Sequence, residues 1–131
     1  MACQGPVIQG GPQVLWTDGA TALYHPITGP LESAQVAAVR PTTEVGARTG
    51  TILVDLVARY SKDGVTRDSW FLVSGFTQLS ANGISQLASW LDLTTGQSVW
   101  RYVQLGFKAS VASGTANQLC AIGWRFDTQA P

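Results

Sequence analysis

Few side chains in the sequence could act as nucleophiles, general bases or soft metal ligands. The chain has one histidine, His25, and two cysteines, Cys3 and Cys120. A lone histidine does not make a multi-histidine metal site, and a nucleophilic cysteine needs a histidine beside it in the fold. Because His25 precedes a proline in a predicted loop, we interpret it as a structural or exposed residue and predict no metal site. The spacing of the two cysteines leaves open whether they form a disulfide or remain free thiols.

The eight carboxylates do not form a pattern that is typical of catalysis. Three of them lie at or near predicted turns, where aspartate bonds to the local backbone: Asp18, Asp63 and Asp92. Asp55 lies within an apolar run instead, and we expect it to form a charge-assisted hydrogen bond with a basic residue on an adjacent strand, such as Arg59 or Arg101. No spacing indicates the facing carboxylates of a glycosidase, a DxDxDG calcium loop or a glycine-rich phosphate loop. The sequence therefore predicts no catalytic residue, no cofactor and a protein that is not an enzyme.

Aromatic side chains are better candidates for a binding surface, since the chain of 131 residues has five tryptophans. Trp100 and Tyr102 share one parity of an alternating run, opposite the parity that contains Phe107, so we expect them to point away from the core. Exposed tryptophan and tyrosine rings stack on sugars and anchor protein interfaces. We therefore name Trp100, Tyr102 and Trp90 as candidate contacts with a glycan or a protein partner. The alternative is that both sheet faces are covered and that these rings belong to the core.

The elements that must position these residues are β-strands. Residues 99–109 and 119–126 place apolar side chains at every second position, which is typical of strands with one buried face. Residues 84–93 also fit helical spacing, but the tight turn that follows them favours a strand. The predicted strands are 13–16, 21–24, 31–40, 51–60, 65–73, 84–93, 99–109 and 119–126.

This succession of short strands and turns predicts one all-β domain. The expected architecture is a two-sheet antiparallel sandwich, jelly-roll-like, with about eight strands. Residues 1–12 hold three glycines and two prolines, and we expect them to form an extended N-terminal arm outside the sandwich domain at 13–131. Such an arm is either a disordered leader or a segment that lies along a neighbouring subunit. It lacks the charged and apolar regions of a secretory signal.

The composition restricts the classes of partner. Eight basic and eight acidic residues give a net charge of zero without a basic stripe, so we expect no nucleic-acid binding. No apolar run is long enough to predict a membrane span. Charged residues make up only 12% of the chain, and a weakly charged surface favours self-association because few charges must be desolvated. The alternative is that a surface rich in serine and threonine has no such role.

Three passages give the chain a resemblance to a known class. They are the arm at 1–12, the run Trp-Arg-Tyr-Val-Gln-Leu-Gly-Phe at 100–107, and the turn at 110–114 followed by Cys-Ala-Ile-Gly-Trp-Arg-Phe at 120–126. In these passages the chain resembles small virion β-sandwich proteins, such as the capsid decoration or protruding domains of phages and other viruses. The resemblance implies a place on the virion surface, assembly as a homotrimer or homodimer, and a viral capsid shell as partner. A surface glycan is the partner that the exposed aromatic residues suggest instead.

The sequence thus predicts a non-enzymatic structural or interaction protein that self-associates. The alternative function is a carbohydrate-binding module or lectin that uses exposed tryptophan and tyrosine rings.

Overall fold

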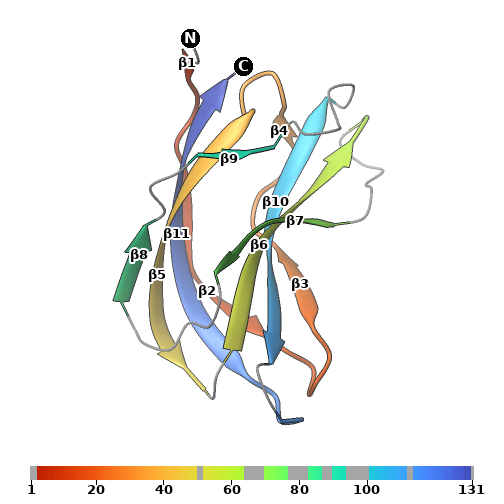
Figure 1. Cartoon of the computed structure of the whole chain (residues 1–131), viewed down its shortest axis with the longest axis vertical. Coiled ribbons are helices and arrows are strands. Elements are labelled where there is room, and N and C mark those ends of the chain that lie inside the picture. The colour runs from red at the N-terminus through yellow and green to blue at the C-terminus, as the bar shows by residue number, and fades with distance from the viewer. Residues whose placement is uncertain are drawn as a thin grey trace.

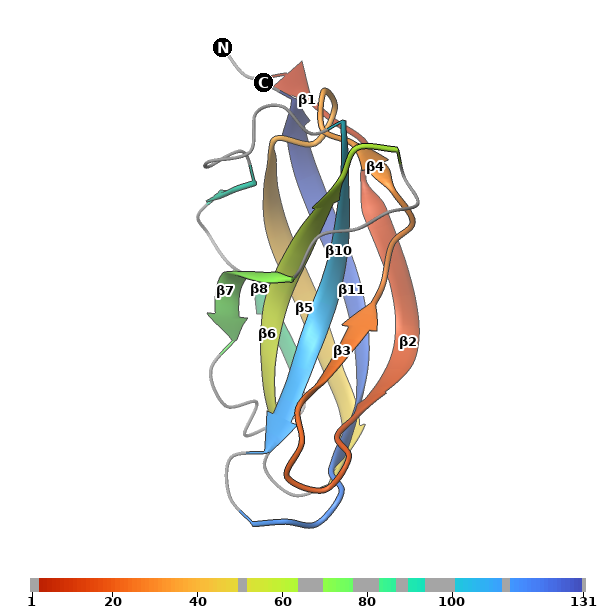
Figure 2. The ribbon, with the colours of Figure 1, turned by 90° about the vertical axis from the view of Figure 1, so that its right-hand side faces the viewer.

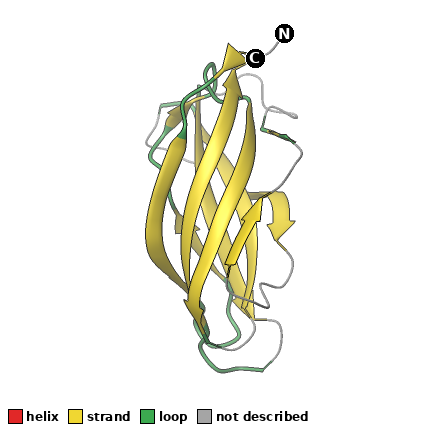
Figure 3. Cartoon of the chain, turned by 90° about the vertical axis from the view of Figure 1, so that its left-hand side faces the viewer, coloured by secondary structure: helices red, strands yellow, loops and turns green. Residues whose placement is uncertain are grey.

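The computed structural model describes residues 3–49, 52–63, 70–76, 83–86, 90–93, 101–111 and 114–130. These residues form eleven strands and no helix, and every strand pairing among them is antiparallel (Figures 1 and 3). The strands lie in two facing layers (Figure 2), which confirms the predicted two-sheet sandwich.

The first sheet has six strands in the order β1-β11-β5-β8, with β2 also paired to β11 and β9 also paired to β5. Its strands are β1 (Cys3–Gln4), β2 (Ile8–Trp16), β5 (Ala38–Arg48), β8 (Gly83–Gln86), β9 (Leu91–Asp92) and β11 (Leu119–Ala130). The second sheet has five strands in the order β3-β10-β6-β7, with β4 also paired to β10. Its strands are β3 (Leu23–Pro26), β4 (Leu31–Glu32), β6 (Ile52–Ser61), β7 (Phe71–Phe76) and β10 (Tyr102–Val111).

The strand order is that of a jelly roll. Among the described residues, eight strands have four or more residues: β2, β3, β5, β6, β7, β8, β10 and β11. Numbered in chain order, they run first-eighth-third-sixth in one sheet and second-seventh-fourth-fifth in the other. Each sheet therefore alternates early and late parts of the chain, as two Greek keys folded into one sandwich do.

The N-terminal segment is extended as predicted, but it does not lie outside the sandwich. β1 and β2 both pair with β11, so the predicted boundary between residues 12 and 13 falls inside a strand. An edge strand pairs on one side only, which is why it tolerates glycine and proline. At Gly11, where φ is +87°, a β-bulge shifts the register with β11 between Ile122 and Trp124.

The predicted strand 31–40 also differs from the structure. It is divided into β4 and the start of β5, and β5 continues beyond Pro41 to Arg48, where no strand was predicted. Pro41 lies between the part of β5 that pairs with β9 and the part that pairs with β8. The described portions of the predicted strand 84–93 are β8 and β9, which favours the strand over the helix. Of the predicted hairpin turn at residues 61–64, Ser61 ends β6, Lys62 and Asp63 form a bend, and Gly64 lies outside the described residues.

The two cysteines are not joined. Cys120 is a buried free thiol near the start of β11. Cys3 pairs with Ala130 at the opposite end of the same strand. A disulfide requires the two Cα atoms within about 7 Å, so this placement rules out the disulfide alternative.

The core lies between the two sheets and contains the predicted apolar face of β10 and β11. Phe107 has no exposed surface and contacts two aromatic rings of the facing sheet, Trp124 at a centroid distance of 5.8 Å and Phe126 at 6.2 Å. Edge-to-face and tilted pairs of this kind add to the energy of burial. The largest side chains that are fully buried are Phe107, Phe126, Leu15, Ile52, Leu56, Leu93, Leu105 and Ile122.

Tyr60 gives the core a dependence on alkaline pH. Its hydroxyl donates a hydrogen bond to the carbonyl of Leu93. Burial, aided by the negative charge of Asp92, raises the pKa of Tyr60 above its ordinary value of 10.0. A raised folded-state pKa means that this stabilisation is complete below pH 10.0 and is lost as the pH rises through the folded-state pKa.

We therefore expect the Tm to fall above this pH, and to fall less steeply in Tyr60→Phe. At neutral pH the same variant should lose about 1 kcal/mol, because the Leu93 carbonyl loses its donor. Thermal denaturation of both proteins from neutral to strongly alkaline pH measures the two slopes. Parallel slopes would show that Tyr60 does not cause the alkaline loss.

Candidate functional site

The structure describes two of the three aromatic residues named from the sequence, and it places them beside different sheets. Trp100 lies outside the described residues. Trp90 is half-buried beside β9 of the first sheet, with the Arg40 guanidinium 5.0 Å from its ring centroid. Tyr102 lies in β10 of the second sheet, with the Arg101 guanidinium 5.1 Å from its ring. A cation thus already lies over each of the two described rings.

A different aromatic pair lies on the outer face of the second sheet. Tyr24 and Trp70 are parallel within 3°, with centroids 5.9 Å apart. The Arg59 guanidinium lies 4.2 Å from the Trp70 ring, and the Lys108 ammonium lies 5.6 Å from the Tyr24 ring. Each such cation–π contact contributes about 0.5–1 kcal/mol at an exposed site. The pair is therefore held by its neighbours as a structural layer over the sheet.

Gly106 makes this arrangement possible and is the sequence feature that indicates it. A Cβ atom at Gly106 would lie 2.8 Å from Cη2 of Trp70 and 2.9 Å from the carbonyl oxygen of His25. Glycine within a strand often marks the close approach of another group. The indole of Trp70 occupies this space.

A basic residue of the adjacent strand does lie opposite Asp55, but it is neither of the two arginines named from the sequence. Arg101 forms an ion pair with Glu32 at 3.2 Å. Arg59 lies on the same strand as Asp55 and donates from Nε to the side-chain oxygen of Gln104 at 2.7 Å. The residue opposite Asp55 on β10 is Lys108. These pairings depend on the register between neighbouring strands, and the register was not predicted from the sequence.

His25 has a structural role, as one of the two interpretations proposed. It is buried, and its Nε2 lies 2.9 Å from the carbonyl oxygen of Trp16. The two rings also meet edge to face at 4.3 Å. Since His25 lies in β3 and Trp16 in β2, these contacts join the two sheets at one edge of the sandwich. Among the described residues, no three His, Cys, Asp or Glu side chains gather as metal ligands.

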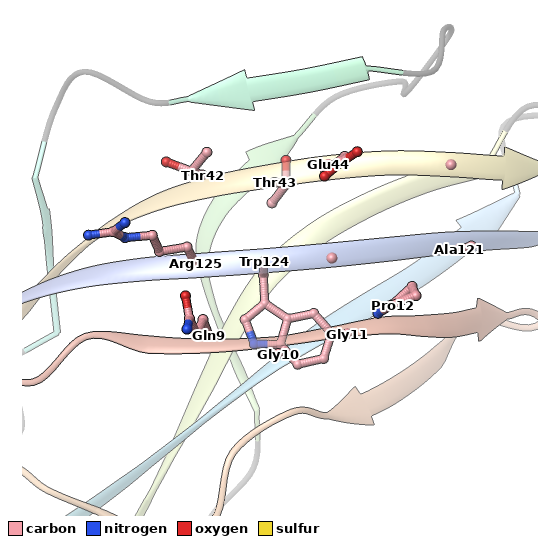
Figure 4. A pocket seen from close by; sticks show the side chains of 12 residues that line it. Gln9, Gly10, Gly11, Pro12, Thr42, Thr43, Glu44, Ala121, Trp124 and Arg125 are labelled. Carbon is pink, nitrogen blue, oxygen red and sulfur yellow. The ribbon is translucent and has the colours of Figure 1, made fainter.

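A shallow groove of about 780 Å³ lies on the outer face of the first sheet, across β2, β11 and β5 (Figure 4). Five small residues contribute to its lining and leave much of the sheet backbone uncovered: Gly10, Gly11, Gly46, Ala121 and Gly123. We call this feature the glycine groove. Glu44 and Arg125 also line it, so that one negative and one positive side chain flank the bare backbone.

Exposed apolar side chains adjoin the glycine groove. Val14 is 48% exposed and pairs with Ala121. Leu119 is 40% exposed and has the same strand parity as Ala121, while Cys120 between them is buried. Trp16, which pairs with Leu119, is 50% exposed at the sheet edge. Large exposed apolar groups beside a hollow are typical of an interaction surface.

Comparison with known proteins finds no matching family model, no matching curated protein and no matching solved structure. In the part of the chain that the structure describes, no helix is long and apolar enough to cross a membrane.

Proposed function

We propose that the protein is a non-enzymatic structural protein that self-associates, in the manner of virion-surface or capsid decoration proteins. The observation that supports this most is the outer face of the first sheet, where exposed Val14 and Leu119 adjoin the glycine groove. Burying such apolar surface contributes about 25 cal/mol per Å². The groove is flanked by only one acidic and one basic side chain, so association requires little desolvation of charge.

The jelly-roll strand order agrees with this proposal but does not establish it. Double-sheet jelly rolls occur in viral capsid domains and in lectins, and one fold serves many functions. The proposed place on a virion therefore rests on the sequence resemblance. The proposed self-association rests on the surface.

The alternative function, glycan binding, has less support. A sugar ring stacks on an open aromatic face, and a guanidinium lies over the rings of Trp90, Tyr102 and Trp70. Tyr24 lies against Trp70, and Trp16 meets the His25 ring edge to face at 4.3 Å.

Light scattering coupled to size-exclusion chromatography tests self-association. We expect a molar mass that is a multiple of the chain mass of 13.9 kDa and that falls only on dilution. Added salt should leave the dissociation constant nearly unchanged, because the interface contains few charges. A monomer at every concentration from low to high micromolar would overturn the proposal.

A further inference from the structure

Two glycines of the glycine groove have no reason inside the chain to be glycine. A Cβ atom at Gly123 would lie 3.8 Å from the carbonyl oxygen of Gly10, and one at Gly46 would lie 3.8 Å from the Cβ of Ala121. Both are ordinary van der Waals distances. Neither glycine has a positive φ. Glycine within a strand lowers stability, so an external reason is needed, and the close approach of another surface is such a reason.

The same face that has the hollow also has a side chain that fits it. Leu119 and Gly123 lie on one strand, two residues to either side of Ala121, and all three share one parity. Consider a two-fold axis that runs between two such faces, perpendicular to β11 and level with Ala121. This axis would place Leu119 of each copy over Gly123 of the other. Val14, which pairs with Ala121, would then lie near the axis. Protrusion and hollow on one patch are what an isologous interface requires.

The charges on this face also suit a second copy. Glu44 and Arg125 have opposite signs and make the groove neutral as a whole. A two-fold axis at Ala121 carries both of them toward the opposite end of the partner's β11, away from the partner's own Glu44 and Arg125. Packing of two such faces therefore keeps the two copies of Glu44 apart from each other, and likewise the two copies of Arg125.

We propose that a second copy of this chain occupies the glycine groove, as a two-fold dimer in which Leu119 of each protomer packs over Gly123 of the other. This inference rests on the proposed self-association and names the surface that performs it. The low floor of the groove lets two sheets approach face to face.

Three variants locate the interface when the dissociation constant is measured by light scattering or analytical ultracentrifugation. Leu119→Ser removes the protruding side chain, and Gly123→Leu fills the hollow. The matched control is Tyr24→Ser, because Tyr24 is 44% exposed, similar to Leu119, but lies in the second sheet. We expect the two groove variants to weaken the dimer by about tenfold or more and the control to leave it nearly unchanged.

Gly123→Ala keeps the test valid if Gly123→Leu does not fold. Its Cβ atom has room in the monomer, so its Tm in dilute, monomeric samples should equal or exceed that of the wild type. It should nevertheless weaken the dimer.

The outcomes separate the two proposals. A wild-type monomer overturns self-association itself, together with the groove dimer. A wild-type oligomer that is unaffected by the groove variants, or weakened as much by Tyr24→Ser, overturns the groove dimer alone. A trimeric mass excludes the two-fold arrangement.

Discussion

Replacement of Phe107 by alanine is expected to lower the free energy of unfolding by about 3–5 kcal/mol. Phe107 has no exposed surface, and its ring contacts Trp124 and Phe126 of the facing sheet. The substitution removes the contact between the two layers and leaves a cavity between rings that cannot all collapse into it. Since a domain of this size is stable by only about 5–15 kcal/mol, the variant should lie near the limit of folding. Urea denaturation followed by tryptophan fluorescence measures the loss.

Phe107→Leu is the control for this experiment, because it keeps an apolar side chain in the same space. Its loss should be clearly smaller than that of the alanine variant. Equal stability of the alanine variant and the wild type would mean that the β10 face does not pack against β11 as described. All samples must be compared at a concentration where the protein is monomeric, since dimer formation adds to apparent stability.

The sequence predicts the inner faces of the sheets better than their edges. The period of two in β10 and β11 is visible because one face is fully buried there. β11 begins at the predicted residue but extends to Ala130, beyond the predicted end at 126, and β10 is Tyr102–Val111 where 99–109 was predicted. β2 was not expected to begin at Ile8, because glycine and proline disfavour a central strand but not an edge strand. The predicted strand was ended before Pro41 for a similar reason. In the structure, Pro41 lies between the part of β5 that pairs with β9 and the part that pairs with β8.

The candidate surfaces were harder to predict because they depend on register. Neither Tyr24 nor Trp70 shows from its own sequence context that the two rings meet. The contact arises because β3 and β6 both pair with β10, and because Trp70 directly precedes β7, which pairs with β6. Gly106 was the available clue, since it interrupts an otherwise continuous strand. The glycine groove is similar, because outward-facing glycines on β5 and β11 become one hollow only when the two strands are neighbours.

Gly11→Ala and Gly114→Ala form a matched pair with a large expected difference. The two glycines have nearly equal φ values of +87° and +85°, so alanine meets a similar conformational cost at both, about 1 kcal/mol. At Gly114 the added Cβ atom would meet nothing within 4 Å. At Gly11 it would lie 2.6 Å from the carbonyl oxygen of Ile122 and 2.8 Å from the Cα of Gly123.

Backbone atoms at these distances cannot turn aside as a flexible side chain does, so β2 must move away from β11. We expect Gly11→Ala to lose about 2–4 kcal/mol, which combines the conformational cost with that of overpacking, and Gly114→Ala to lose only the first part. Amide exchange along β2 should also become faster in Gly11→Ala alone, because the bulge holds this edge strand in register. Equal losses in the two variants would show that the bulge at Gly11 does not pack against β11, and the hollow beside it would then lack the close strand pairing on which the proposed dimer depends.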